Sequence, residues 1–99
     1  MADPNLPNII AYNAPAHMQK GLLAYLYQGR PPGGFLAAVL QNDLWRAALQ
    51  ADATNARFLA AYGTILNAMP QEAWGSQEAV KRWIKQGGLE GAAEEASYV

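Results

Sequence analysis

Residues 31–43 read Pro-Pro-Gly-Gly-Phe-Leu-Ala-Ala-Val-Leu-Gln-Asn-Asp, and this stretch decides the fold. A proline cannot continue a helix, and it also disfavours the helical conformation of the residue before it, so the chain must turn ahead of Gly33. The apolar residues that follow recur at helical spacing. The stretch therefore predicts a chain reversal that leads into one helix from Gly33 or Gly34 to Ala51.

The sequence on either side predicts three further helices. They are residues 15–28, which are followed by Gly29; about 53–69, which follow the capping residues Asp52 to Thr54; and a helix that begins after Ser76 and ends at Gly87-Gly88. Small polar residues accept hydrogen bonds from free N–H groups at helix starts, and glycine commonly closes helices.

These helices and their short connections predict an all-α fold, a compact bundle of about four helices. Residues 15–88 form the predicted helical domain. Residues 1–14 are expected to be an irregular lead because they carry two prolines and several asparagines. Residues 89–99 form an acidic tail, which we expect to be either disordered or ordered by contact with a neighbouring copy.

The composition excludes several classes of protein. Of the 99 residues, 52% are hydrophobic and 15% are charged, which does not fit a disordered chain. The net charge of −1 comes with no basic stripe, which argues against general nucleic-acid binding. There is no cysteine and one histidine, so we expect neither a metal nor a cofactor. No signal peptide or membrane span is recognisable, which favours a cytoplasmic protein without membrane contact.

Two polar side chains fall on helix faces that are otherwise apolar. A helical projection places Asp43 within the buried face of the second helix and Asn55 within that of the third. A carboxylate there costs several kcal/mol unless it is hydrogen-bonded or paired. Either Asp43 is architectural, as a cap or a bonded core residue, or it lines a ligand pocket together with Asn42, Arg46 and Asn55.

The two glycines before the second helix also allow two interpretations. Backbone N–H groups at Gly33 and Gly34 could approach an anion, with Arg30 beside them as a phosphate partner. The same glycines could simply permit a close approach between helices. The stretch is not a P-loop, because the spacing and the lysine of that motif are absent.

Trp45 lies outside the apolar face of its helix, and a large exposed aromatic residue is uncommon on a monomer. We therefore predict that Trp45 contacts another chain in a homo-oligomer. No constellation of nucleophile, base and orienting group is present, so we do not expect an enzyme.

The run PPGGFLAAVLQNDLWRAALQADATNARFL, followed by LNAMP, AWGS and VKRWIKQGG, resembles a family of small proteins encoded by bacteriophages and prophages. The family pattern is PGGFLxAVLxNDL, ADxxN, NxxP, WGS and WxxxGG, and the match covers about residues 16–88. The resemblance implies a phage origin and therefore the cytoplasm of a bacterial host. It supplies no catalytic residues.

Together these observations predict a non-catalytic binding protein that counteracts a host function such as immunity. It would bind a host protein or sequester a small nucleotide-like signal. In the second version, Arg30, Gly33 and Gly34 hold phosphate, while Asn42, Asp43 and Asn55 read the base. One alternative is a DNA-associated regulator that uses Lys81, Arg82 and Lys85, and another is a structural or virion-associated adaptor that uses Trp45.

Overall fold

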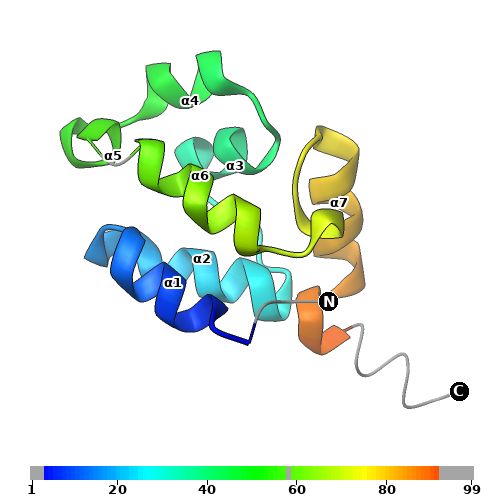
Figure 1. Cartoon of the computed structure of the whole chain (residues 1–99). Coiled ribbons are helices and arrows are strands. Elements are labelled where there is room, and N and C mark those ends of the chain that lie inside the picture. The colour runs from blue at the N-terminus through cyan, green and yellow to red at the C-terminus, as the bar shows by residue number, and fades with distance from the viewer. Residues whose placement is uncertain (1–3, 58, 92–99) are drawn as a thin grey trace, which may run out of the picture.

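The computed structural model describes residues 4–57 and 59–91, and this part of the chain contains helices and no β-strand (Figure 1). The helices are α1 (Leu6–Asn13), α2 (Ala16–Gln28), α3 (Gly34–Leu40), α4 (Leu44–Gln50), α5 (Ala53–Arg57), α6 (Leu59–Ala68), the 3-10 helix η1 (Gln71–Ala73) and α7 (Gln77–Gln86). Residues 88–91 add a helical turn. The all-α class is confirmed, but the helices are more numerous and shorter than the predicted four. The tail beyond residue 91 lies outside the described residues.

The N-terminal segment is helical, so the predicted irregular lead is wrong. In α1, Leu6 and Ile10 are four residues apart, share one face and are fully buried. Pro7 lies in the first turn, where the missing N–H has no partner to lose. The helix packs against α2 and α6. The prolines and asparagines that suggested a loop therefore mark the start of a helix.

The predicted second helix is interrupted, which corrects the expectation of one helix from Gly33 or Gly34 to Ala51. Asn42 adopts a left-handed conformation with φ of 61°, which asparagine tolerates better than most residues. Its N–H donates to the carbonyl of Val39 at 3.1 Å, and the N–H of Asp43 donates to that of Ala38 at 2.9 Å. This pair of bonds is a Schellman motif, so α3 ends here and the chain turns into α4.

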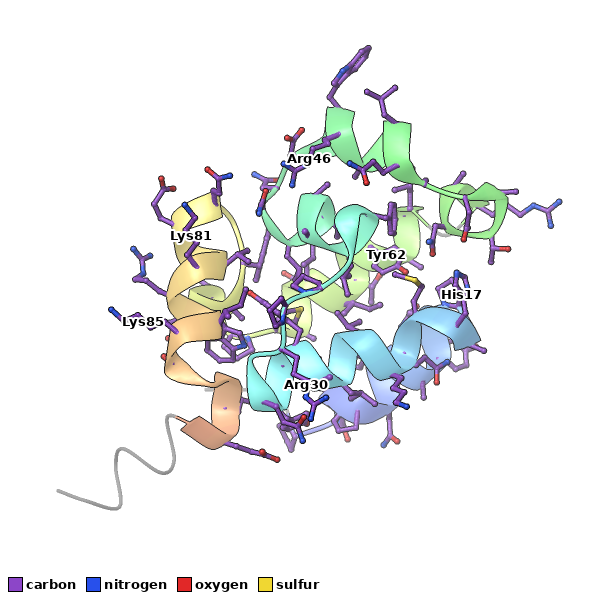
Figure 2. All side chains as sticks on the ribbon, turned by 180° about the vertical axis from the view of Figure 1, so that it is seen from behind. His17, Arg30, Arg46, Tyr62, Lys81 and Lys85 are labelled. Carbon is purple, nitrogen blue, oxygen red and sulfur yellow. The ribbon has the colours of Figure 1, made fainter. Side chains whose placement is uncertain are left out.

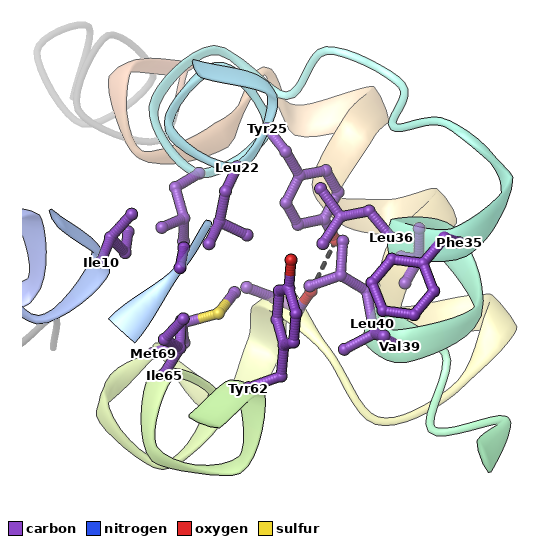
Figure 3. Close-up of a cluster of buried hydrophobic side chains, with 14 of the residues drawn as sticks. Ile10, Leu22, Tyr25, Phe35, Leu36, Val39, Leu40, Tyr62, Ile65 and Met69 are labelled. Atoms are coloured by element: carbon purple, nitrogen blue, oxygen red, sulfur yellow. Dashed lines mark hydrogen bonds between the residues drawn. The ribbon is translucent and has the colours of Figure 1, made fainter. Parts of the chain in front are cut away.

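The hydrophobic core lies among α1, α2, α3, α6 and α7 (Figure 3). Its fully buried large side chains are Leu6, Ile10, Leu22, Tyr25, Leu26, Leu40 and Ile65. The ring of Phe35 meets that of Tyr62 edge-on, with ring centroids 5.4 Å apart. In Figure 1, α4 lies on the outer side of α3 and α6, at the far side of the molecule from α1 and α2. It therefore contributes only Ala47 to the core.

Hydrogen bonds and a close backbone contact tie the end of α2 to η1 and to α7 with its C-terminal glycines. The indole N–H of Trp83 donates to the carbonyl of Tyr25 at 3.0 Å, while the hydroxyl of Tyr25 donates to the carbonyl of Ala73. Gly29 and Gly88, both with φ of 68°, lie backbone against backbone. A Cβ atom at Gly88 would lie 2.6 Å from the nitrogen of Gly29. The Trp and the last Gly of the WxxxGG pattern thus dock α7 onto α2.

Three predicted helix boundaries are confirmed. A side-chain oxygen of Asp52 accepts from the N–H of Asn55 at 2.7 Å at the start of α5, and that of Ser76 accepts from Ala79 at 3.1 Å at the start of α7. Gly87 closes α7 in the left-handed conformation. None of the helices in the described residues combines the length and hydropathy needed to cross a membrane.

Candidate functional site

Of the polar residues predicted to bind a nucleotide, Asn42, Asp43 and Arg46 lie together, whereas Arg30 lies apart from them. Figure 2 shows Arg30 and Arg46 at opposite ends of the molecule, because Arg30 follows α2 whereas Arg46 lies on α4. Arg30 borders a shallow hollow with Lys20, Tyr27 and Glu90. A phosphate held by Arg30 would therefore lie at the other end of the molecule from Asp43, one of the predicted base-reading residues, which contacts Arg46.

Asp43 is not on the core face of a helix, as the projection of an unbroken helix predicted. It is the N-cap of α4, where its Oδ1 accepts from the backbone N–H of Arg46 at 3.0 Å. Its other oxygen lies 3.9 Å from Nε of Arg46, and the guanidinium also donates to Gln41. The carboxylate is half-buried. Because the Schellman turn rotates the chain at Asn42, Asp43 starts a helix instead of lying within one.

Asn55 is buried, as predicted, and its side chain has an internal partner. The hydroxyl of Tyr62 donates to Oδ1 of Asn55 at 3.1 Å, and only 3% of Asn55 is exposed. Asn55 thereby links α5 to α6. The architectural interpretation of this residue accounts for its position.

Of the two glycines at the start of α3, only Gly34 lies close to another helix, since a Cβ atom at Gly33 would meet nothing within 4 Å. A Cβ atom at Gly34 would collide with the side-chain amide of Gln50, which lies at the end of α4. The space beside Gly34 is thus filled by the end of the exposed, flexible Gln50 side chain. Gly33 is the N-cap residue of α3 and has extended backbone angles.

The most unusual feature of the described residues is the outer face of α4. Three large apolar side chains are exposed there, Leu44 by 74%, Trp45 by 77% and Leu49 by 70%. We call these three residues the α4 surface. In Figure 2 the side chains at this end of the molecule point away from the body of the fold. The exposure of Trp45 agrees with its predicted position outside the apolar face of its helix.

A groove runs beside the α4 surface, between α4 and α6. Its volume is about 180 Å³, and most of its wall is apolar. The residues that line it are Val39, Asn42, Asp43, Leu44, Ala47, Leu59, Tyr62, Gly63 and Leu66. Asn42 and Asp43 therefore do border a concave site, but as its rim beside apolar walls. Leu44 belongs to both the groove and the α4 surface.

Sequence reasoning missed Leu44 and Leu49. The signal was present, because Trp45 and Leu49 are four residues apart and lie on the same side of a helix that begins at Leu44. It became visible only once the helix break at Asn42 was known. In the projection of an unbroken helix, Leu44 lies next to the buried face and cannot be distinguished from a core residue.

The other candidate groups lie apart from this groove. The side chains of Lys81, Arg82 and Lys85 are exposed on α7, where they share the surface with Glu78. His17 pairs with Asp52 at 3.1 Å and so connects the start of α2 to the start of α5. The hydrogen bond from the backbone of Asn55 is the main reason why the pKa of Asp52 is lowered. Within the described residues, no cluster of acidic or histidine side chains could hold a metal ion.

The buried tyrosine at the groove makes stability depend on alkaline pH. Burial, with a smaller effect from the charge of Asp52, raises the pKa of Tyr62 to about 12. In the unfolded chain this phenol ionises near 10. The folded state therefore retains a proton that the unfolded state releases, and the stabilisation is complete below pH 10 and lost as pH rises toward 12.

We expect the free energy of unfolding to fall by up to about 1.4 kcal/mol per pH unit from this group above pH 10. Urea unfolding at pH 9, 10 and 11 measures the slope. Tyr62→Phe has no proton to release, so its slope should be smaller than that of the wild type. Equal slopes in the two proteins would contradict the assignment to Tyr62.

Comparison of the chain with protein-family models, with curated proteins and with solved structures gave no match.

Proposed function

We propose that the protein is a non-catalytic binding protein that acts by stoichiometric contact with another protein through the α4 surface. The observation that carries this proposal is the exposure of Leu44, Trp45 and Leu49 on one seven-residue helix beside an apolar groove. Contiguous exposed apolar patches mark interaction sites on small proteins. The resemblance to phage-encoded proteins supports a bacterial host protein as the partner, with an immune function as the leading candidate.

The apolar side chains of the α4 surface predict an apolar binding surface on the partner. Burying each of these side chains would contribute about 1.5–3 kcal/mol, so the three together can account for a substantial part of a binding energy. Tryptophan is also among the residues that most often dominate interfaces. The groove lies between two helices and is largely apolar, which suits the apolar face of a helix on the partner.

The nucleotide version of the sequence hypothesis has less support. Arg30 lies at the opposite end of the molecule from Arg46, which contacts Asp43, and Asn55 and Asp43 already accept hydrogen bonds within the chain. A ligand that used them would have to break these bonds. The apolar groove offers few donors to a base edge.

A site-specific photo-crosslinker tests the proposed function in the bacterial host. We expect p-benzoylphenylalanine at position 45 to form an adduct of discrete mass with a host protein, since this side chain would lie in the interface. The matched control is the same group at position 12, because Tyr12 is 89% exposed and belongs to α1, outside the α4 surface.

A heteromeric adduct at position 45 that is absent at position 12 and is abolished by Leu49→Asp supports the proposal. Adducts that form equally from both positions, or none from position 45, refute it. Leu49→Asp should leave the fold intact because Leu49 does not pack in the core.

A further inference from the structure

The α4 surface combines a projection with a hollow on the same side of the molecule. Trp45 extends into solvent from α4, and the groove opens next to it between α4 and α6. Gly63 lies in the groove wall, and a Cβ atom there would meet nothing within 4 Å. The missing side chain thus leaves the groove open at this point.

A two-fold axis can place the projection of each copy in the hollow of the other. Residues in a helix follow each other by about 100°, so Ala48 lies about 40° from Leu44 and about 60° from Trp45 around α4. It is exposed and small, and it lies between the groove side and the projecting side. Two copies of α4 could therefore approach closely at Ala48, with Trp45 of each copy reaching over the groove of the other.

The charges near this face allow such a pairing. Arg46 is the only charged residue within α4, and its guanidinium is directed toward Asp43 and Gln41. No charge of α4 would thus be brought against its own copy across the axis. Asp43 also borders the groove, but its carboxylate caps α4 and lies 3.9 Å from Nε of Arg46, so these two opposite charges offset each other within one copy. Such a face gains little from a charged partner and is matched by an equally apolar one.

The exposed area is of the right order for a dimer. A large apolar side chain exposes on the order of 150 Å², so the α4 surfaces of two copies contribute about 900 Å². The walls of both grooves and the neighbouring side chains add to this. Specific interfaces begin near about 1,200 Å² of total buried area.

We propose that a second copy of the chain covers the α4 surface when no other protein is bound, with Trp45 of each copy inserted into the groove of the other. The inference rests on the proposed function in that it concerns the same binding surface. A partner protein would then have to displace the second copy, so dimerisation and partner binding would compete for the α4 surface.

Sedimentation velocity on three proteins tests this arrangement. The wild type should sediment as a dimer in the tens-of-micromolar range. Trp45→Ala removes the projection, and Gly63→Leu fills the groove without a clash inside the chain. Each variant alone should be monomeric, with association weakened at least about 100-fold. Circular dichroism should show that both remain folded, because both positions are exposed.

Mixing the two variants provides the decisive measurement. The Gly63→Leu protein retains Trp45, and the Trp45→Ala protein retains the open groove, so one of the two equivalent contacts can form between them. We expect a heterodimer in the mixture, weaker than the wild-type dimer but absent from either variant alone. A nonspecific apolar patch would not lose its self-association in Gly63→Leu and recover it when the two variants are mixed.

Three outcomes would overturn the proposal. They are a wild type that stays monomeric at several hundred micromolar, a Gly63→Leu protein that dimerises like the wild type, or a mixture in which no heterodimer forms.

The chain contains no cysteine, which allows an independent check of the axis. Ala48→Cys should form an intermolecular disulfide on mild oxidation much faster than Tyr12→Cys, whose position is also exposed. Equal rates would refute the position of the axis at Ala48.

These experiments separate the two proposals. A wild-type dimer together with no host adduct from position 45 leaves the dimer standing and removes the proposed function. A monomeric wild type that still gives the host adduct does the reverse.

Discussion

Replacing Gly88 by alanine should lower the free energy of unfolding by about 3 kcal/mol, since two costs add at this position. The residue has φ of 68°, a conformation that disfavours a side chain. Its Cβ atom would also lie 2.6 Å from the nitrogen of Gly29 and 2.7 Å from the carbonyl oxygen of Leu26. Both are backbone atoms, so the ends of α2 and α7 would have to separate.

The measurement is thermal unfolding followed by circular dichroism. For a chain of this size, about 3 kcal/mol corresponds to a decrease of roughly 15 °C in Tm. The matched control is Gly21→Ala, which lies in the middle of α2 and would place its Cβ atom in open space. That substitution should raise stability by about 0.5–1 kcal/mol. Similar effects at the two glycines would show that the contact between α2 and α7 is not a close one.

Trp83→Ala should cost about 4 kcal/mol, the range found when a buried tryptophan or phenylalanine is removed from a core. Trp83 is 3% exposed, and its indole N–H donates to the carbonyl of Tyr25. Its loss leaves a cavity between α7 and α2 and a buried carbonyl without its donor. Because small domains have stabilities of about 5–15 kcal/mol, the variant should be close to unfolding at room temperature.

Trp45→Ala is the control for this prediction, because it removes the same side chain from an exposed position. At concentrations low enough to keep the chain monomeric, it should change the free energy of unfolding by less than about 0.5 kcal/mol. Urea unfolding of the two variants and the wild type gives all three values. A large loss in Trp45→Ala under these conditions would mean that α4 packs more deeply than its exposure indicates.

The pattern PGGFLxAVLxNDL, ADxxN, NxxP, WGS and WxxxGG consists largely of residues that build the fold. Asn42 and Asp43 stop one helix and start the next, while Gly34 admits Gln50 and Gly88 meets Gly29. These residues were attractive as ligand contacts because polar residues and glycines also form binding sites. Here their hydrogen bonds and close contacts lie within the chain. Of the three residues of the α4 surface, Trp45 and Leu49 lie outside the pattern, and Leu44 is the residue that ends its NDL element.

The sequence alone determined the helical class, the caps at Asp52 and Ser76, and the exposure of Trp45. These features depend on interactions within a few residues, namely caps, left-handed glycines and the periodicity of apolar side chains. The N-terminal helix was missed because Pro4 and Pro7 were interpreted as breakers, although a proline in the first turn is tolerated. Burial of Leu6 and Ile10 against other helices then stabilises α1.

The tertiary structure decided which side chains serve the fold and which are exposed for binding. One left-handed residue at Asn42 changes the direction of the chain, so every side chain from Asp43 to Gln50 faces differently from the projection of an unbroken helix. Asp43 thereby moves from the core to a cap, and Leu44 and Leu49 join Trp45 on an exposed face. A helical projection assumes constant rotation along the chain, and a single turn residue is enough to invalidate it.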